Sequence, residues 1–429
     1  MKLYFINLKK HDVREGLDFM LNTPKGLRLQ IGIFGKRNVG KSSILNAIVK
    51  QDVAIVSDFP GTTTDPVDKA MELQPLGPVL LIDTAGFDDD AAGIGEKRVE
   101  RTRKVIDRCD MALLVCTAEN RSQEEEDFAA IFKERNIPCI VICNKTDIQE
   151  PDQAFQDRLA AIGVPLVSMS VKTGKGLESL REKLIELAPE GYLVNRPMLG
   201  DLTQTKKPVL LITPIDKEAP KGRLIMPEVQ AIRDALDHEA WCAVVKDNAI
   251  QDVLDTLKEP PVLAVTDSQV FGPVSKAVPE GIPLTSFSIL MARMKGDLNA
   301  CAAGAAAISK LRSGDKILIA EGCSHHPIAE DIGRVKLPRW LKEYTKQDLE
   351  FVHVQGQDFP DDLSPFALVI HCGACTFNRR GVLSRILQCE RAGVPFTNYG
   401  VAIAFLHGIL ERALSPFPEA LKAYRQVKE

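Results

Sequence analysis

Short apolar runs recur along the chain, and polar or glycine-containing turns separate them from stretches with helical spacing. A continuous apolar run of this kind is typical of a strand buried on both faces of a parallel sheet. Stretches such as residues 43–48 and 227–236 have the spacing of amphipathic helices between such strands. The alternation predicts an α/β protein with parallel sheets. The predicted strands are residues 29–34, 79–82, 111–115, 140–143, 166–169, 209–212, 241–245, 262–265, 316–320 and 366–370.

The first predicted strand leads into GKRNVGKS at residues 35–42, which fits G-x-x-x-x-G-K-[ST] between a strand and a helix. The backbone N–H groups of such a loop point at a polyphosphate, and the following helix adds its positive dipole end. Lys41 would reach the β- and γ-phosphates, and the Ser42 hydroxyl would bind Mg²⁺. Read alone, the alternative is an ordinary glycine-rich turn. The residues expected to bind nucleotide here are Gly35, Asn38, Val39, Gly40, Lys41, Ser42 and Ser43.

Two further segments suit the phosphates and the metal ion. Residues 58–65, DFPGTTTD, predict an exposed loop in which Thr63, beside Thr62, would complete the Mg²⁺ shell when a γ-phosphate is present. The strand at 79–82 ends in Asp83, which can hold a Mg²⁺-bound water, and the Gly86 N–H can meet the γ-phosphate. We therefore expect Lys41, Thr63 and Gly86 to act on the transferred phosphate.

The last two segments suit a guanine base. The strand at 140–143 ends in NKTD, residues 144–147, and the Asp147 carboxylate can accept both the N1–H and the exocyclic amine of guanine, which adenine does not offer. Ser170, Val171 and Lys172 follow the next strand and can close over the base. The expected base-side residues are thus Asn144, Lys145, Asp147, Ser170, Val171 and Lys172.

The five segments, in this order and spacing, resemble the Era and TrmE GTPases, and the resemblance covers about residues 29–188. It implies hydrolysis of GTP to GDP with Mg²⁺. Ras-like enzymes place a water-orienting glutamine where this chain has Phe87. TrmE-like GTPases use an asparagine at the position of Asn38 to coordinate K⁺, so the resemblance implies slow hydrolysis that K⁺ stimulates.

Composition narrows the class of protein. Of 429 residues, 45% are hydrophobic and 26% charged, which is ordinary for a globular protein with a sizeable core. The net charge of −4 and the lack of a basic stripe with interleaved aromatics argue against a nucleic-acid partner. We see no signal peptide and no apolar run that would span a membrane, so we expect a cytoplasmic protein with no membrane partner. Four of the ten cysteines lie in or beside predicted strands and are expected to be buried thiols: Cys109, Cys116, Cys139 and Cys143.

Residues 188–208 are rich in proline, glycine and polar residues, which predicts a domain boundary. The small α/β region that follows shows no catalytic cluster. In the last region, Cys323 and His325 directly follow one predicted strand, and HCGAC at residues 371–375 directly follows another. The carboxyl edge of a parallel sheet is where sites are built. Zinc could take three thiolates and one histidine, and a [4Fe–4S] cluster could take the three thiolates, with an exchangeable fourth ligand. The spacing also allows no metal at all.

The GTPase segments together with Cys323-x-His325 and His371-Cys372-x-x-Cys375 resemble the HydF family of [FeFe]-hydrogenase maturation GTPases. The resemblance implies a [4Fe–4S] cluster on Cys323, Cys372 and Cys375, with His325 and His371 as further candidate iron ligands. It also implies a scaffold that carries a transient diiron precursor, made with the radical-SAM maturases HydE and HydG, to apo-[FeFe]-hydrogenase in an anaerobic hydrogen-metabolising microbe.

The implied domains are an N-terminal extension at 1–28, a GTPase domain at 29–188, a linker and dimerisation domain at 189–261, and a cluster-binding domain at 262–429. A homodimer is expected, and a higher oligomer is left open. Two rival functions also stay open: an RNA- or ribosome-associated GTPase with a zinc-stabilised tail, and a redox enzyme that uses the cluster for electron transfer.

Overall fold

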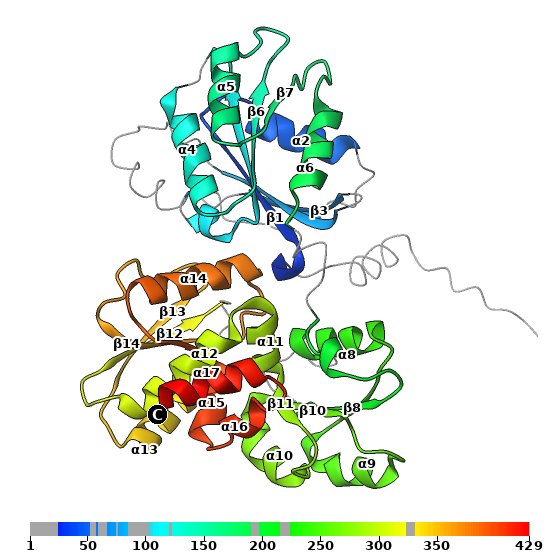
Figure 1. Ribbon diagram of the computed structural model, residues 1–429, viewed down its shortest axis with the longest axis vertical. Coiled ribbons are helices and arrows are strands. Elements are labelled where there is room, and N and C mark those ends of the chain that lie inside the picture. Colours follow the sequence, from blue (N-terminus) through cyan, green and yellow to red (C-terminus); the bar gives the residue numbers. More distant parts are fainter. Residues whose placement is uncertain are drawn as a thin grey trace, which may run out of the picture. The chain divides into compact units, whose positions relative to one another are not determined.

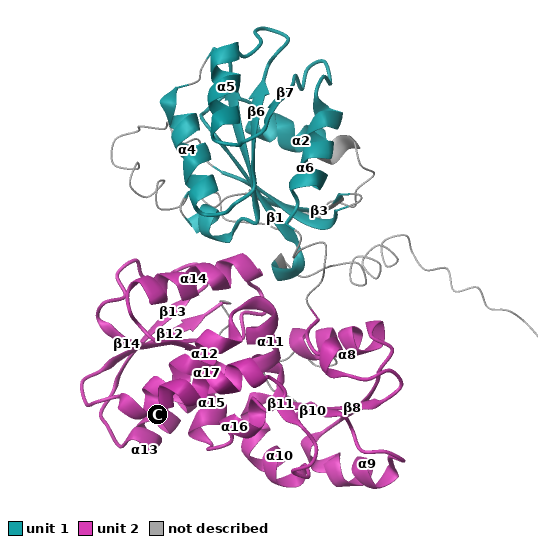
Figure 2. Cartoon of the chain, in the orientation of Figure 1, with its two compact units in different colours: residues 1–193 teal, residues 194–429 magenta. Residues whose placement is uncertain are grey.

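The computed structural model describes residues 25–51, 57–58, 67–73, 76–84, 102, 104–119, 122–189, 197–214, 224–322 and 331–428. The chain forms two compact units, residues 1–193 and 194–429 (Figures 1 and 2). Both units are built mainly from parallel sheets covered by helices, so the predicted α/β class is confirmed.

The first unit contains a seven-stranded sheet of order β2-β3-β4-β1-β5-β6-β7. Strand β3 runs antiparallel to its neighbours, and the pairs from β4 through β7 are parallel. The strands are β1 (Leu29–Gly35), β2 (Ser57–Asp58), β3 (Val67–Leu73), β4 (Gly77–Asp83), β5 (Met111–Thr117), β6 (Cys139–Asn144) and β7 (Leu166–Ser168).

Helices cover both faces of this sheet, because alternate residues of each strand pack into two separate hydrophobic cores, one on each face. One core joins Leu29, Ile31 and Ile33 to helices α2 (Lys41–Gln51) and α6 (Leu177–Leu187). The other core lies on the opposite face and includes α4 (Gln123–Glu134) and α5 (Gln153–Ala161). The four cysteines expected to be buried, Cys109, Cys116, Cys139 and Cys143, are buried here.

The second unit contains two four-stranded parallel sheets. The first has the order β11-β10-β8-β9 and the second the order β13-β12-β14-β15. The predicted boundary between residues 261 and 262 falls inside the first sheet, because β8 pairs with β10. The strands are β8 (Pro208–Ile212), β9 (Trp241–Val245), β10 (Leu263–Thr266), β11 (Leu284–Ser286), β12 (Lys316–Glu321), β13 (Glu350–Gln355), β14 (Phe366–His371) and β15 (Phe396–Asn398).

One hydrophobic core extends from Met198 to Tyr424 and includes residues of both sheets. At its centre α11 contacts α15, and α12 contacts α17. The helices of this unit are α8 (Met226–Asp237), α9 (Ile250–Thr256), α10 (Phe271–Ala277), α11 (Phe287–Lys295), α12 (Leu298–Ala305), α13 (Leu337–Thr345), α14 (Arg379–Arg391), α15 (Tyr399–Leu406), α16 (Leu410–Ala413) and α17 (Pro418–Lys428). Among the helices described, none combines the length and the apolar character needed to cross a bilayer.

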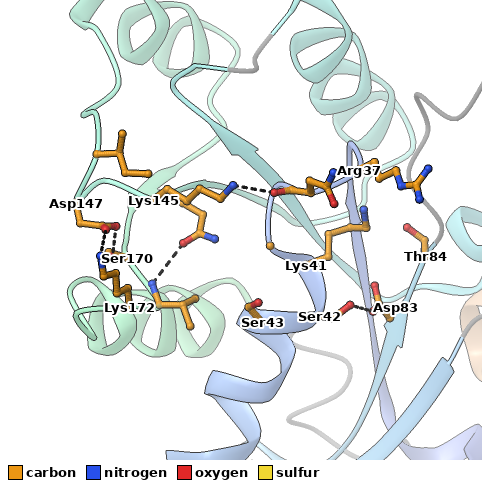
Figure 3. Close-up of a pocket in the computed structure, with 15 residues that line it drawn as sticks. Arg37, Lys41, Ser42, Ser43, Asp83, Thr84, Lys145, Asp147, Ser170 and Lys172 are labelled. Atoms are coloured by element: carbon orange, nitrogen blue, oxygen red, sulfur yellow. Dashed lines mark hydrogen bonds and ion pairs between the residues drawn. The ribbon is translucent and has the colours of Figure 1, made fainter.

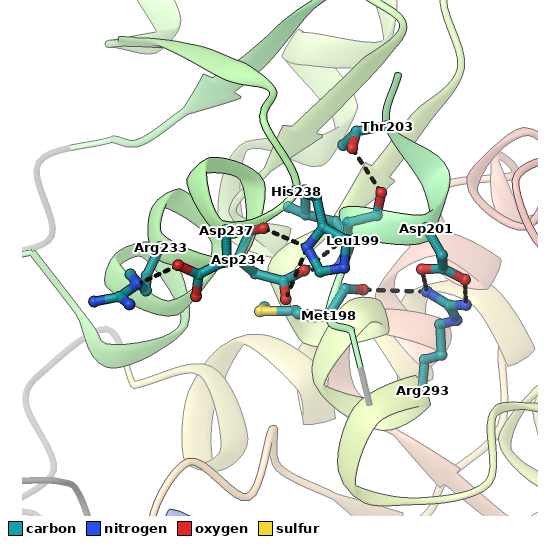
Figure 4. Close-up of polar contacts among 10 residues, drawn as sticks. Met198, Leu199, Asp201, Thr203, Arg233, Asp234, Asp237, His238 and Arg293 are labelled. Carbon is teal, nitrogen blue, oxygen red and sulfur yellow. Dashed lines mark hydrogen bonds and ion pairs between the residues drawn. The ribbon is translucent and has the colours of Figure 1, made fainter. Parts of the chain in front are cut away.

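The first described residues of the second unit are fastened to its helices by polar contacts (Figure 4). The Asp234 carboxylate on α8 accepts the N–H groups of Leu199 and Gly200 at 2.8 and 2.7 Å. Arg293 on α11 donates to the Asp201 carboxylate at 2.8 Å and to the Met198 carbonyl at 3.3 Å. Burial alone would raise the pKa of Asp201, but the hydrogen bonds and charge of Arg293 lower it. Residues 198–201 are therefore held by hydrogen bonds to both α8 and α11.

Candidate functional site

A pocket of about 790 Å³ opens at the carboxyl ends of the parallel strands in the first unit (Figure 3). Its size suits a nucleotide-sized ligand. In Figure 3, Lys41, Ser42 and Asp83 lie at one end, and Asp147, Ser170 and Lys172 lie at the other. The lining residues are Arg37, Asn38, Gly40, Lys41, Ser42, Ser43, Asp83, Thr84, Asn144, Lys145, Asp147, Ile148, Ser170, Val171 and Lys172.

The loop between β1 and α2 needs its two glycines. Gly35 has φ +145°, and a Cβ there would lie 2.2 Å from the Val115 carbonyl oxygen. Gly40 has φ +101°, and a Cβ there would lie 2.4 Å from the side-chain nitrogen of Asn144. Side chains are excluded at both points, so the backbone N–H groups can face a ligand. The Lys41 ammonium donates to the carbonyls of Gly35 and Lys36 at 2.9 and 2.7 Å, inside the loop.

Ser42 and Asp83 form the metal end of the pocket. The Ser42 hydroxyl donates to Asp83 Oδ2 at 2.7 Å. The other carboxylate oxygen, Asp83 Oδ1, is buried and has no hydrogen-bond donor among the described residues. A buried, unpaired carboxylate oxygen beside a hydroxyl is a donor set of the hard oxygens that Mg²⁺ prefers. The two residues therefore fit a magnesium ion that reaches Asp83 through a bound water.

The base end is tied to the phosphate loop by two side chains of the NKTD segment. The Asn144 amide donates to the Val39 carbonyl at 3.0 Å, and the Lys145 ammonium donates to the Asn38 carbonyl at 2.9 Å. Asn144 also accepts the Val171 N–H at 3.4 Å. One pair of side chains thus fixes the distance between the loop that would hold the phosphates and the loop that would hold the base.

The Asp147 carboxylate is held ionised at the rim of the base end. Its Oδ1 accepts from the Ser170 hydroxyl at 2.6 Å, and this hydrogen bond is the main cause that lowers the pKa of Asp147. The Lys172 ammonium lies 3.9 Å from its Oδ2 and acts in the same direction. An ionised carboxylate offers only acceptors, which suits the N1–H and amine of guanine and not the acceptor N1 of adenine.

Sequence reasoning missed one buried ion pair behind the phosphate loop. The Lys36 ammonium donates to the Ser122 hydroxyl at 2.5 Å and lies 3.4 Å from Glu125 Oε1, and Glu125 is fully buried. The spacing Ser122-x-x-Glu125 is a capping-box signal that could have pointed to it, since the structure shows that box at the start of α4. Arg37, Thr84 and Ile148 also line the pocket and were not predicted. Thr62, Thr63 and Gly86 lie outside the described residues.

The second unit places two of the predicted thiols at the carboxyl edge of its second sheet. Cys372 directly follows β14, and its Sγ accepts the N–H groups of Gly322 at 3.0 Å and Ala374 at 3.4 Å. Gly322 directly follows the neighbouring strand β12. Burial raises the pKa of the Cys372 thiol, and it raises that of Cys375 to about 11. Cys323 and His325, the other half of the motif, lie outside the described residues.

A buried lysine holds the loop that carries Cys375. The Lys295 side chain on α11 is 3% exposed, and its ammonium donates to three carbonyls: Ala374 at 3.1 Å, Cys375 at 2.8 Å and Phe377 at 2.7 Å. Burial lowers the pKa of Lys295 to about 8, and the nearby thiols act against that shift. A buried cation beside two thiols is an arrangement that offsets negative charge on thiolates.

Arg385 and His371 lie on the Cys372 side of the loop. Arg385 Nη1 lies 2.8 Å from His371 Nε2, and His371 Nδ1 lies 2.8 Å from the Cys372 carbonyl oxygen. Burial, and then the Arg385 charge, lower the pKa of His371 to about 3, so the ring is neutral.

The thiol site fits an iron–sulfur cluster in the chemistry of its donors. N–H groups donating to sulfur and buried cations are features that stabilise thiolate-bound clusters. Within the part of the chain that the structure describes, no group of three His, Cys, Asp or Glu side chains is arranged to hold a metal ion. Cys372 and Cys375 would supply two thiolates, and Cys323, the third ligand that the resemblance implies, lies outside the described residues.

Three family models match the chain. Residues 30–145 match a model described as 50S ribosome-binding GTPase. Residues 198–296 match the hydrogen maturase F dimerization domain, and residues 299–416 match the hydrogen maturase F tetramerization domain. Those last two together span about half of the chain. The chain belongs to the hydrogen maturase F family. The prediction of a P-loop GTPase domain followed by α/β domains of this family is thereby confirmed.

Among curated proteins, this hydrogen maturase F family member is similar to several GTPases. A GTPase Der from Wolinella succinogenes is 33% identical over 193 residues, which are 43% of this chain and 40% of the relative. The tRNA modification GTPase MnmE from Bacillus subtilis is 36% identical over 173 residues, which are 40% of this chain and 36% of the relative. The chain thus spans about two fifths of the length of these two relatives. Among solved structures, the G domain of the T. maritima FeoB iron transporter is 26% identical, with a TM-score of 0.31, over 38% of this chain and 99% of that one.

Proposed function

We propose that the chain hydrolyses GTP and serves the maturation of [FeFe]-hydrogenase as a scaffold that carries a diiron precursor to the apo-enzyme. The observation that carries the proposal is the presence, in one chain, of a guanine-nucleotide pocket and a half-buried pair of thiols at a sheet edge. The family and the Der and MnmE relatives support GTP hydrolysis. The two hydrogen maturase F domains support the maturation role.

In the nucleotide pocket, each described residue has a task that its contacts suggest. Lys41 exchanges its two backbone carbonyl acceptors for the β- and γ-phosphates. Ser42 and Asp83 hold Mg²⁺, directly and through water, and Asp147 selects guanine. Thr63 and Gly86 remain proposed partners of the γ-phosphate on the basis of the sequence. The steady-state release of phosphate from GTP, compared with ATP, tests this assignment.

Asn38 is the proposed ligand for a potassium ion beside the phosphates. Its backbone is held with φ 62°, its carbonyl accepts from Lys145, and it lines the pocket beside Lys41. We expect faster GTP turnover in KCl than in NaCl, and we expect Asn38→Ala to remove the difference between the two salts. Equal rates in the two salts would remove the potassium role.

In the second unit, Cys372 and Cys375 would hold a [4Fe–4S] cluster together with Cys323. Such a cluster, bound by three thiolates, leaves one iron open to a further ligand, which suits a fragment that must arrive and later leave. The protein contributes N–H donors to Cys372 Sγ and the buried Lys295 and Arg385 cations. The two hydrogen maturase F matches suit a boundary near 296–299 between their domains, and the sequence supports 29–188 as the GTPase domain.

A second copy of the chain is the partner proposed for the edge of the first sheet of unit 2. Strand β9 is an edge strand, and Trp241 and Val244 on it are 43% and 42% exposed. Leu224, just before α8, and Val229 and Leu236 on α8 are exposed as well. An unpaired edge with exposed apolar side chains favours pairing with another strand, and this region matches the dimerization domain. Trp241→Asp with Val244→Asp should lower the molecular mass measured by light scattering, and an unchanged mass would place the interface elsewhere.

Anaerobic reconstitution separates the proposal from its zinc rival. We expect brown protein with acid-labile sulfide that activates apo-hydrogenase after loading by the radical-SAM maturases HydE and HydG, with GTP changing the rate. Colourless protein with stoichiometric zinc would favour the RNA- or ribosome-associated GTPase. A cluster that exchanges electrons but transfers no diiron fragment would favour the redox enzyme.

A further inference from the structure

His371 is buried at the end of β14, directly before the first thiol of the HCGAC loop. Its side chain is 1% exposed, and its ring packs against the rings of Phe377 and Phe396, with centroid distances of 6.0 Å to each. A histidine next to a thiol pair is a natural candidate for an iron ligand. Whether it can bind iron depends on what its two ring nitrogens already contact.

The contacts of the ring fix which nitrogen carries the proton. Arg385 Nη1 lies 2.8 Å from His371 Nε2, and a guanidinium can only donate, so Nε2 accepts. The Cys372 carbonyl oxygen lies 2.8 Å from Nδ1, and a carbonyl can only accept, so Nδ1 carries the hydrogen and donates it. Both ring nitrogens of His371 therefore have hydrogen-bond partners within the protein. The lone pair that could bind a metal ion belongs to Nε2, and it points at the Arg385 guanidinium.

Arg385 is itself held in place by contacts with three other residues. Its guanidinium carbon lies over the rings of Phe359 and Phe377, 4.8 and 4.4 Å from their centroids. Its Nη2 donates to the Gly356 carbonyl at 2.5 Å. The side chain is nearly buried, at 4% exposure for the residue. Swinging this group away from His371 would break two stacking contacts and a hydrogen bond, so the arrangement opposes release of Nε2.

We propose that His371 is a positioning residue that orients the Cys372 peptide, that Arg385 enforces its Nδ1–H tautomer, and that His371 is not an iron ligand. With its carbonyl held by the ring, the Cys372 peptide keeps Sγ within reach of the N–H groups of Gly322 and Ala374. The tautomer assignment is independent of any metal. The statement about iron rests on the proposed cluster on Cys323, Cys372 and Cys375.

The tautomer is tested in metal-free, full-length protein labelled with ¹⁵N-histidine. Long-range ¹H–¹⁵N correlation spectra distinguish a protonated Nδ1 from a protonated Nε2, and His371→Asn identifies the signal. We expect Nδ1–H with an unprotonated Nε2, a shift toward tautomer exchange in Arg385→Met, and recovery of the wild-type pattern in Arg385→Lys, which restores a donor. An Nε2–H tautomer in the wild-type protein would overturn the proposal.

The role toward iron is tested after anaerobic reconstitution with ferrous iron and sulfide. Asparagine can place an N–H near the position of Nδ1, so His371→Asn should keep the iron content of the wild type, while His371→Leu should lose much of it. Pulsed EPR of the reduced, ¹⁵N-histidine-labelled protein should give the same nitrogen couplings in the wild type and His371→Asn. Loss of a strong coupling in His371→Asn, but not in the matched variant His325→Asn, would overturn the proposal. Iron-free wild-type protein would instead defeat the proposed cluster and leave the tautomer result standing.

Discussion

Replacing Lys295 with methionine tests how the loop that carries Cys375 is held. Methionine has a similar length and no donor, so the variant removes three hydrogen bonds from a buried ammonium to the carbonyls of Ala374, Cys375 and Phe377. Hydrogen bonds to a charged group contribute about 1.5–3 kcal/mol each, which sums to about 5–9 kcal/mol. Against this stands the cost of burying the charge.

The pKa of Lys295 gives the net size of that cost, after the opposing effect of the nearby thiols. Its fall from the ordinary value of 10.5 to about 8 corresponds to about 3 kcal/mol, at 1.36 kcal/mol per pH unit. Methionine recovers this amount, so we expect a net loss of about 2–6 kcal/mol in the free energy of unfolding of the second unit. For a unit of this size, even about 3 kcal/mol lowers the melting temperature by about 6–12 °C.

The assay is calorimetry of the metal-free, full-length protein. The two compact units should melt separately, and GDP should raise only the transition of the first unit, since the pocket lies there. Lys310→Met is the matched control, because that lysine is exposed and makes one 3.4 Å contact with the Val427 carbonyl. If Lys295→Met melts within about 1 °C of the wild type, the three hydrogen bonds do no more than offset desolvation and the reasoning fails.

Three predictions concern the nucleotide pocket. Asp147→Asn replaces one acceptor by a donor facing the guanine amine, so GTP affinity should fall about 100-fold and xanthine nucleotides should bind in its place; retained GTP preference in competition binding would contradict the assignment. Asp83→Asn should weaken GTP binding about tenfold with Mg²⁺ and leave binding in EDTA unchanged, because the charged anchor of the metal is lost and the Ser42 contact can persist. The hydrogen bond from the Ser170 hydroxyl lowers the pKa of Asp147, so guanine binding that needs the carboxylate is present above that pKa and lost as the pH falls through it. When GTP affinity is measured from pH 7 downward, the loss should begin at a higher pH in Ser170→Ala than in the wild type. Coincident curves for the two proteins would contradict this.

Most of the nucleotide pocket could be predicted from the sequence, because each motif lies at the end of an apolar strand and parallel strands bring such ends together. The predicted strands at 29–34, 79–82, 111–115 and 140–143 are strands of one sheet. The tie between Lys145 and Asn38 joins residues 107 positions apart, and no local pattern encodes it. The Lys36 pair with Glu125 was missed for the same reason, although a capping-box signal was present.

In the second unit, the fold class could be predicted from the sequence, but the boundary between its domains could not. Its strands were recognised from their apolar runs, but the predicted boundary at residue 261 falls between strands of one sheet. Crossover topology decides which strands pair, and hydrophobic pattern alone does not report it. The contacts of Lys295 and Arg385 could not be predicted from the sequence either, because each joins residues far apart in the chain. Lys295 contacts the Cys375 carbonyl, 80 positions away, and Arg385 contacts His371, 14 positions away.

The central claim is that one chain couples a GTPase to a cluster held by three thiolates. The most direct measurement is the iron and acid-labile sulfide content per chain after anaerobic reconstitution of the wild type, of Cys372→Ser, and of Cys389→Ser as a buried-thiol control outside the loop. We predict about four iron and four sulfide ions per chain in the wild type and the control, and a large loss in Cys372→Ser. Equal iron and sulfide in all three proteins, with the same activation of apo-hydrogenase, would contradict the account.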